Sequence, residues 1–481
     1  MKTPSRILTA SLIGALVMAT TLSAQQMDRT KRPVPQKAPV IGLPAFQKAT
    51  LSNGLAVWLV EEHKLPLVAF NLVLQSGAAC DPADRPGLAT LTAELMDAGT
   101  KTMDALQIAD RLDFIGTSLR ISANVDGTSA SLMTLSKHLD EALAIYTEVL
   151  TTPTFPQKEF DRIKKQRLTS LLQQKDRAAV TATIAFNHIL YGSNHPYGND
   201  PSGTEASVTA MTRDDVAKFY ESYYRPNNGT LIVVGDVTLK EFLPRLEKSF
   251  AGWKNAPFPA AAIAKAPEQG TRKVYLIDKP GAPQSEIRIG YPCLSRSTPD
   301  FFPVQVLNRL LGGQFSSRIN MNLRERHGYT YGARSVFVLN KQAGPFYASG
   351  GFVSTKTDSS IRELLHEIDR TCKDGVSSEE LEFGKRGMIG AFALGFETPM
   401  QIAAGLQNIV LYNLPENYFN TYLQNIDAVT LEEVQKVAKR YLDSSKMSVV
   451  VVGDVKEIRK GIEALQIGET VLCDVAGNPV K

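Results

Sequence analysis

The sequence contains one pattern twice: TRDDVAK at 212–218 with LIVVGDV at 231–237, and TLEEVQK at 430–436 with VVVVGDV at 449–455. In each copy, a Thr followed three residues later by an acid predicts the capped start of a helix. The β-branched run that ends at Gly-Asp predicts a buried strand. The first Thr and the last Val are 25 residues apart in both copies. This constant spacing predicts two homologous halves built on the same helix–strand unit.

A Pro- and Ala-rich segment at 256–270 lies between the two copies and predicts an exposed linker. We therefore expect one half-domain at 46–255 and a second at 271–481. Strands are predicted at 55–60, 68–74, 274–277 and 287–291, and helices at 139–150, 160–174, 304–311 and 359–372. Because strands and helices do not alternate strictly, the pattern favours an α+β fold. In each half we expect a mainly antiparallel sheet with helices packed on one face.

Composition limits the classes of partner. A chain of 481 residues is long enough for roughly two to four domains. Its hydrophobic content of 43% and charged content of 21% are ordinary for a soluble globular protein. The formal net charge of +4 is close to neutral for this length, which argues against a nucleic acid partner.

The first 24 residues have the pattern of a secretory signal peptide. Lys2 and Arg6 precede an apolar run at 7–22, and Ser23-Ala24 supplies a small residue for cleavage. The run is shorter than the roughly 20 residues that a membrane-spanning helix needs, although an uncleaved anchor is the alternative. We expect export to a bacterial periplasm, no stable membrane insertion, and an N-terminal extension at 25–45.

The residues that most often bind metals show no metal-site spacing. No C-x-x-C pair occurs, which excludes a structural zinc site of that type, and the sequence does not choose between disulfides and free thiols for Cys80, Cys293, Cys372 and Cys473. No H-E-x-x-H or H-x-x-E-H spacing occurs among the histidines, so surface or hydrogen-bonded structural roles are expected for His63, His138, His188, His195, His327 and His366.

The stretch most informative about function is GLATLTAELMDAGT at 87–100, which we predict to be a helix. Its G-L-A…G-T frame resembles the segment around the H-x-x-E-H motif of the pitrilysin/insulinase-like metallopeptidases, or inverzincins. Further family-like motifs are LSNGL at 51–55, SG at 76–77, HPYG at 195–198 and YRPNN at 224–228. With its duplicated halves, the mature chain resembles the subunits of mitochondrial processing peptidase and its bacterial relatives, in which two subunits close around a peptide.

The resemblance implies a zinc site that has lost its chemistry. In the family, two His one helical turn apart hold zinc, and the Glu between them activates the metal-bound water. Here Thr90 and Glu94 stand at the two His positions and Ala93 stands at the Glu position. The family's third ligand, a Glu on a second helix, falls at Leu171. A hydroxyl, a lone carboxylate and a Leu do not form a zinc site, and Ala cannot accept a proton from water. We therefore expect neither a metal nor a catalytic residue in this chain alone.

The second half retains a different family-like segment, GGQFSSR at 312–318 and LRERHGYTY at 323–331. It resembles the family's S-S-R…L-R-E…G-x-x-Y segment. The resemblance implies that Arg324 and Tyr331 bind substrate at a zinc site across the chamber. Arg supplies a charge and fixed N–H donors, and Tyr supplies an O–H, so both can stabilise an oxyanion or hold a peptide. The alternative is that Arg324 forms a structural salt bridge with Glu325 and that Tyr331 lies in the core.

Three functions follow from these features. The first is a non-catalytic subunit of a periplasmic zinc metallopeptidase heterodimer, which completes the peptide chamber and supplies Arg324 and Tyr331 to the partner's zinc site. The partner is then a catalytic subunit of the same family that carries the zinc ion. The second is a binding or assembly protein of the same fold with no role in proteolysis. The third, an active peptidase acting alone, requires a metal site outside these motifs.

Overall fold

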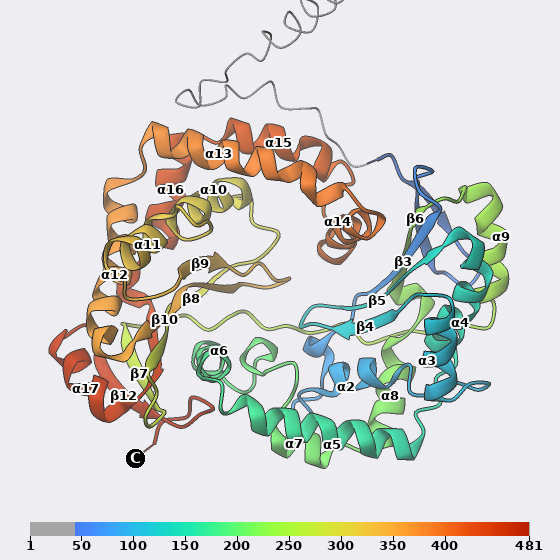
Figure 1. Ribbon diagram of the computed structural model, residues 1–481, viewed down its shortest axis with the longest axis horizontal. Coiled ribbons are helices and arrows are strands. Elements are labelled where there is room, and N and C mark those ends of the chain that lie inside the picture. Colours follow the sequence, from blue (N-terminus) through green and yellow to red (C-terminus); the bar gives the residue numbers. More distant parts are fainter. Residues whose placement is uncertain (1–43, 481) are drawn as a thin grey trace, which may run out of the picture. The chain divides into compact units, whose positions relative to one another are not determined.

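The computed structural model describes residues 44–480, and Figure 1 shows their strands and helices. The predicted signal peptide at 1–24 and almost all of the extension at 25–45 lie outside the described residues. No helix within 44–480 has the length and apolarity needed to cross a bilayer. Over the same range the four cysteines are free thiols.

The first half contains a six-stranded sheet with the order β1-β2-β6-β3-β5-β4. Only the β2–β6 pair is parallel. The buried strand β6 is the strand of the first sequence repeat, and it lies inside the sheet as its continuous β-branched run predicts. The strands are β1 (Gln47–Thr50), β2 (Ala56–Glu61), β3 (Leu67–Leu74), β4 (Leu119–Ala123), β5 (Thr128–Leu135) and β6 (Gly229–Gly235).

The second half repeats this arrangement with the order β12-β7-β11-β8-β10-β9. The β12–β7 and β7–β11 pairs are parallel and the other pairs are antiparallel. Strand β11, from the second repeat, is fully buried. The strands are β7 (Lys273–Asp278), β8 (Gln284–Leu294), β9 (Ala333–Phe337), β10 (Gly344–Val353), β11 (Ser448–Gly453) and β12 (Glu469–Cys473).

Helices from the same half cover one face of each sheet and form its main core. Those of the first half are α2 (Leu88–Leu95), α3 (Ala105–Phe114), α4 (Leu139–Thr151), α5 (Gln157–Gln174), α7 (Glu205–Ala210), α8 (Arg213–Tyr223) and α9 (Leu239–Phe250). Those of the second half are α10 (Phe301–Leu311), α11 (Arg318–Asn320), the π-helix η5 (Met321–Arg326), α12 (Thr357–Asp374), α13 (Ser378–Phe392), α15 (Tyr418–Ala428), α16 (Leu431–Tyr441) and α17 (Val455–Ala464). Short 3₁₀ turns are η1 (Ala78–Cys80), η2 (Ser136–His138), η3 (Pro196–Gly198), η4 (Pro226–Asn228), η6 (Ser354–Lys356), η7 (Ala393–Phe396) and η8 (Ser444–Lys446).

Each half also contributes one helix to the sheet of the other half. Helix α14 (Pro399–Tyr412) packs on β3 and β6, and helix α6 (Ala178–Tyr191) packs on β8 and β11. Both contacts have an apolar core. A polar contact accompanies each: Asn71 of β3 donates to Gln407 of α14 at 2.8 Å, and Arg288 of β8 donates to the Ala179 carbonyl of α6 at 2.9 Å. This exchange joins the two halves in both directions.

The predicted α+β fold with two homologous halves is confirmed, and the exchanged helices add a layer on the second face of each sheet. The repeated capping boxes form as predicted, at Thr212 with Asp215 and at Thr430 with Glu433. The strands of the two sheets lie within 46–255 and 271–481, whose exact limits stay a prediction.

The predicted helix at 87–100 is wrong at its C-terminal end, because α2 stops at Leu95. Gly99 has φ +156°, and Thr100 leaves the helix to form a β-bridge with Pro153. Thr100 also donates a hydrogen bond to Glu148 of α4 at 2.6 Å. The tertiary contacts of Thr100 therefore replace the last helical turn.

Candidate functional site

Helix α2 begins at a turn that requires glycine. Gly87 has φ +100°, and a Cβ at this residue would lie 2.7 Å from the Cα of Gly203. The Asp81 carboxylate accepts hydrogen bonds from the Gly87 and Ala89 N–H groups, both at 2.7 Å. These contacts satisfy N–H groups that have no partner within the helix. The close approach of Gly87 to Gly203, and the hydrogen bond that Thr90 donates to the Pro201 carbonyl, place α2 against the loop at 201–203.

An arginine lies where the family-like frame expects a metal ion. Arg167 of α5 donates one hydrogen bond to the Thr90 hydroxyl at 3.0 Å and another to the Ser202 carbonyl at 2.8 Å. Its other terminal nitrogen forms an ion pair with the Glu94 carboxylate at 2.6 Å. Only 6% of the Arg167 side chain is exposed, against 48% for Glu94. The guanidinium therefore joins the residues at the two predicted His positions.

The remaining predicted positions are apolar and packed. Ala93 is 2% exposed and Leu171 is 7% exposed, and Leu171 belongs to the main core of the first half. Leu171 lies one helical turn after Arg167, so both face α2 from the same side of α5. Sequence reasoning did not identify Arg167, although its position four residues before Leu171 was a usable signal.

The residues present do not fit zinc. Zinc requires ligands with free lone pairs, whereas Glu94 is already paired with a cation and the Thr90 hydroxyl is held by the Pro201 carbonyl at 2.5 Å. An open hollow of about 630 Å³ beside the site is lined by three cations and one acid, namely Arg162, Lys165, Arg167 and Glu94. This excess of positive charge disfavours a further cation. Within 44–480, no three His, Cys, Asp or Glu side chains cluster closely enough to hold a metal ion.

Arg324 lies on the π-helix η5 with its side chain 40% exposed. Its guanidinium lies 4.7 Å from the centre of the Phe315 ring, a cation–π contact, and its Nε lies 3.1 Å from the Glu325 carboxylate. The ion pair with Glu325 is the one that the structural alternative expects. Both partners are well exposed, so the pair contributes no more than about 1 kcal/mol and leaves the guanidinium available.

Tyr331 is not a core residue. Its exposed fraction is 88%, in the loop that leads into β9, so this part of the structural alternative is wrong. A hollow of about 790 Å³ is lined by Phe315, which Arg324 contacts, and by Gly332, which follows Tyr331 in the chain, although neither Arg324 nor Tyr331 lines it. This volume lies in the range of pockets that bind drug-sized ligands. Phe315, 60% exposed beneath Arg324, is a candidate contact residue that sequence reasoning did not single out.

The capping carboxylate of α2 gives a testable pH dependence. Burial raises the pKa of Asp81 to about 7, against the opposing effect of the Gly87 and Ala89 N–H groups and the Arg167 charge. The folded state therefore keeps this proton at pH values where the unfolded chain, with a pKa of about 4, has released it. This group should lower the free energy of unfolding as pH rises from about 4 to about 7, by at most about 4 kcal/mol, with no further change above 7.

The measurement compares chemical unfolding of the wild-type chain and Asp81→Asn between pH 4 and pH 9. Because Asn does not titrate, the difference in unfolding free energy isolates Asp81, and it should favour the wild type most at low pH. Asp84→Asn is the control, since that side chain is 73% exposed. A wild-type minus Asp81→Asn difference that is flat across this range contradicts the prediction.

Comparison with known proteins places both halves in one group. A family model described as "Insulinase (Peptidase family M16)" matches residues 56–190, and one described as "Peptidase M16 inactive domain" matches residues 210–388. A non-peptidase homologue from Helicobacter pylori, YmxG, is 23% identical over 82% of this chain and 91% of its own length. The zinc protease PqqE from the same bacterium is 22% identical over 85% and 93%. A crystal structure of a peptidase M16 inactive domain from Pseudomonas fluorescens has a TM-score of 0.80 and 26% identity, covering 85% of this chain and 98% of that one.

Proposed function

Because this chain is an inactive member of the insulinase family, peptidase family M16, we propose that it is the non-catalytic subunit of a zinc metallopeptidase heterodimer. Its partner in this proposal is a catalytic subunit of the same family, which holds the zinc ion. Zinc would supply an activated water there, and the present chain would supply walls and binding groups.

The observation that carries this proposal is the position of Arg167. A buried guanidinium that pairs with Glu94 and holds Thr90 gives the first half a stable structure without a metal ion. If the zinc ligands had been lost with no compensating change, the polar side chains at the site would have no partners. Here Thr90 and Glu94 both bind Arg167. The first half-domain is therefore adapted to fold without its own zinc ion. Any contribution of this chain to catalysis must come from another of its surfaces.

Arg324 and Tyr331 are the groups that this chain would lend to its partner. Tyr331 is 88% exposed, and Tyr and Arg are, with Trp, the side chains most enriched at binding hot spots. Arg324 adds a positive charge beside the same hollow. A peptide held there would meet a cation, a hydroxyl and the Phe315 ring.

The relatives support a partner of the same family. Helicobacter pylori has both a protein described as a non-peptidase homologue and one described as a zinc protease, and each aligns with most of this chain. A pair of this kind supplies one member with a zinc site and one without. The secretory pattern at 1–24 supports a periplasmic location for the proposed complex. Oligopeptides and unfolded segments are the substrates that a closed chamber would admit.

Reconstitution tests the proposal. The full chain is expressed alone, and together with a same-genome M16 protein that has an intact H-x-x-E-H motif. We expect no peptide hydrolysis from this chain alone, low activity from the partner alone, and chelator-sensitive activity from the purified complex. Peptide hydrolysis by the homogeneous single chain, abolished by a chelator, would contradict the proposal. A partner that is equally active without this chain would instead favour a binding or assembly protein.

A further inference from the structure

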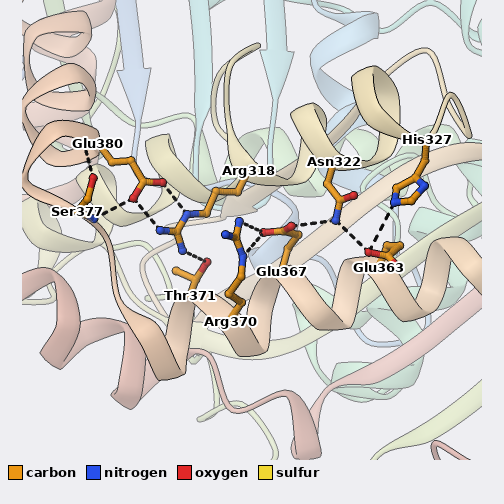
Figure 2. Close-up of polar contacts among 9 residues, drawn as sticks. All are labelled: Arg318, Asn322, His327, Glu363, Glu367, Arg370, Thr371, Ser377 and Glu380. Atoms are coloured by element: carbon orange, nitrogen blue, oxygen red, sulfur yellow. Dashed lines mark hydrogen bonds and ion pairs between the residues drawn. The ribbon is translucent and has the colours of Figure 1, made fainter.

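The π-helix that carries Arg324 is held to helix α12 by a buried amide, and His327 at its C-terminal end also lies 4.0 Å from Glu363 of α12 (Figure 2). Asn322 is 4% exposed, and its Nδ2 donates to Glu367 Oε1 at 2.8 Å and to Glu363 Oε2 at 3.0 Å. Figure 2 shows Asn322 pointing toward these two carboxylates, which lie one turn apart on α12. The π geometry is visible in the backbone, where the His327 N–H donates to the Asn322 carbonyl at 3.1 Å.

An amide suits this place better than other side chains of similar size. The two carboxylates can only accept hydrogen bonds, so the residue between them must present two donors, which the Asn NH₂ group does. Aspartate would add a third like charge, and leucine would leave both carboxylates without this donor. Glu367 is 2% exposed, so the loss of a hydrogen bond there carries a desolvation cost.

Ion pairs on either side hold the same framework. Arg370 binds Glu367 Oε2 with its Nη2 at 2.6 Å, and Arg318 binds Glu380 of α13 through two nitrogens at 2.7 and 2.8 Å. Arg318 also donates to Thr371 of α12 at 3.1 Å. Arg318 opens α11, so the segment that leads into the π-helix is tied to α12 and α13 before Asn322 is reached (Figure 2).

We propose that Asn322 is a positioning residue, which fixes the rotation of η5 about its axis and so holds Arg324 over the Phe315 ring. Residues two apart on a helix point to different sides, and here Asn322 is buried against α12 while Arg324 faces solvent. A helix anchored on its inner side cannot turn without moving the outer side chain. π-helical turns are rare and often occur at functional sites.

This proposal rests on the proposed function, in which Arg324 binds the substrate of the complex. Misplacement of a binding group by about 1 Å can cost up to about 100-fold in rate. We expect Asn322→Leu to lower kcat/KM of the complex by about 10-fold. Asn322→Gln keeps the donor and the fold but lengthens the anchor by one methylene, so it should give a smaller loss.

The structural arm of the test does not depend on activity. A crystal structure of Asn322→Leu should show the His327 N–H moving from the residue 322 carbonyl to that of Leu323, and Arg324 leaving Phe315. Thr357→Val is the matched control, since it removes a buried hydrogen bond to Ser285 at the other end of α12. An Asn322→Leu structure in which η5 and Arg324 stay in place overturns the positioning role.

The kinetic arm is a double-mutant cycle with Arg324→Ala in the reconstituted complex. If Asn322 acts through Arg324, Asn322→Leu should change kcat/KM by less than about 2-fold in the Arg324→Ala background. A loss of about 10-fold in both backgrounds shows a purely structural role and overturns the inference. If Arg324→Ala reduces activity and neither Asn322 variant does, the inference fails and the proposed function stands. If Arg324→Ala itself has no effect, the substrate-binding role of Arg324 fails and the inference fails with it, whereas the requirement of the partner for this chain is judged by the reconstitution.

Discussion

Zinc binding should return when the family's ligands are restored, and restoration should work only if Arg167 is also removed. The restored set consists of Thr90→His, Ala93→Glu, Glu94→His and Leu171→Glu. With Arg167→Gln added, we expect this variant to bind zinc at least about 100-fold more tightly than the same variant with Arg167 retained. Gln keeps a donor for the Ser202 carbonyl without the charge.

The reason is electrostatic. Two unit charges 4 Å apart interact by about 4 kcal/mol at the effective dielectric constant of a partly buried site, and zinc carries two charges. A 100-fold change in affinity corresponds to only about 2.7 kcal/mol, so the prediction survives considerable screening. The Glu94→His change also removes the carboxylate that now neutralises Arg167.

Zinc content after dialysis and titration calorimetry measure the effect. Lys158→Gln in the restored background is the matched control, because Lys158 is exposed on the same helix and does not line the hollow beside the site. It should not improve zinc binding. Equal zinc affinity with and without Arg167 would show that its charge does not reach the ligand positions.

The second large effect concerns the reconstituted complex. Arg324→Ala should lower kcat/KM by about 100-fold, the usual loss when a donor to a developing oxyanion is removed. Tyr331→Phe should lower it by about 10-fold, the value of one hydrogen bond of roughly 1.4 kcal/mol. Both side chains are exposed, so the stability of the isolated chain should change by no more than about 0.5 kcal/mol.

Steady-state kinetics on a quenched fluorescent peptide, with thermal unfolding of each variant, provide the measurement. Arg326→Ala is the control, because Arg326 is also exposed on η5 and its substitution removes the same charge from the same helix. Full activity of Arg324→Ala, or a loss no larger than that of Arg326→Ala, would mean that the pair has no direct role and that Tyr331 is exposed for another reason.

Local patterns predicted most of the fold. The capping boxes at Thr212 and Thr430 and the runs that became β6 and β11 depend on neighbours within a few residues, so their physics is present in the sequence. The exchange of α6 and α14 between the halves was not predicted, because an apolar helix face does not specify which sheet covers it. Likewise, the end of α2 was set by the partners of Thr100 on other elements.

The sequence by itself determined that the chain is a duplicated α+β protein, and its resemblance to the family implies that Thr90, Ala93, Glu94 and Leu171 stand where a zinc site would need His and Glu. These conclusions depend on residue identity and spacing, which the sequence contains in full. Only the tertiary structure decided that Arg167 joins Thr90 to Glu94, that Tyr331 is exposed, and that Asn322 anchors η5. Each of these facts is either a distance between side chains from segments far apart in the chain, or the solvent exposure of a side chain that such segments determine. Such distances are set by how whole helices pack, which no short stretch of sequence encodes.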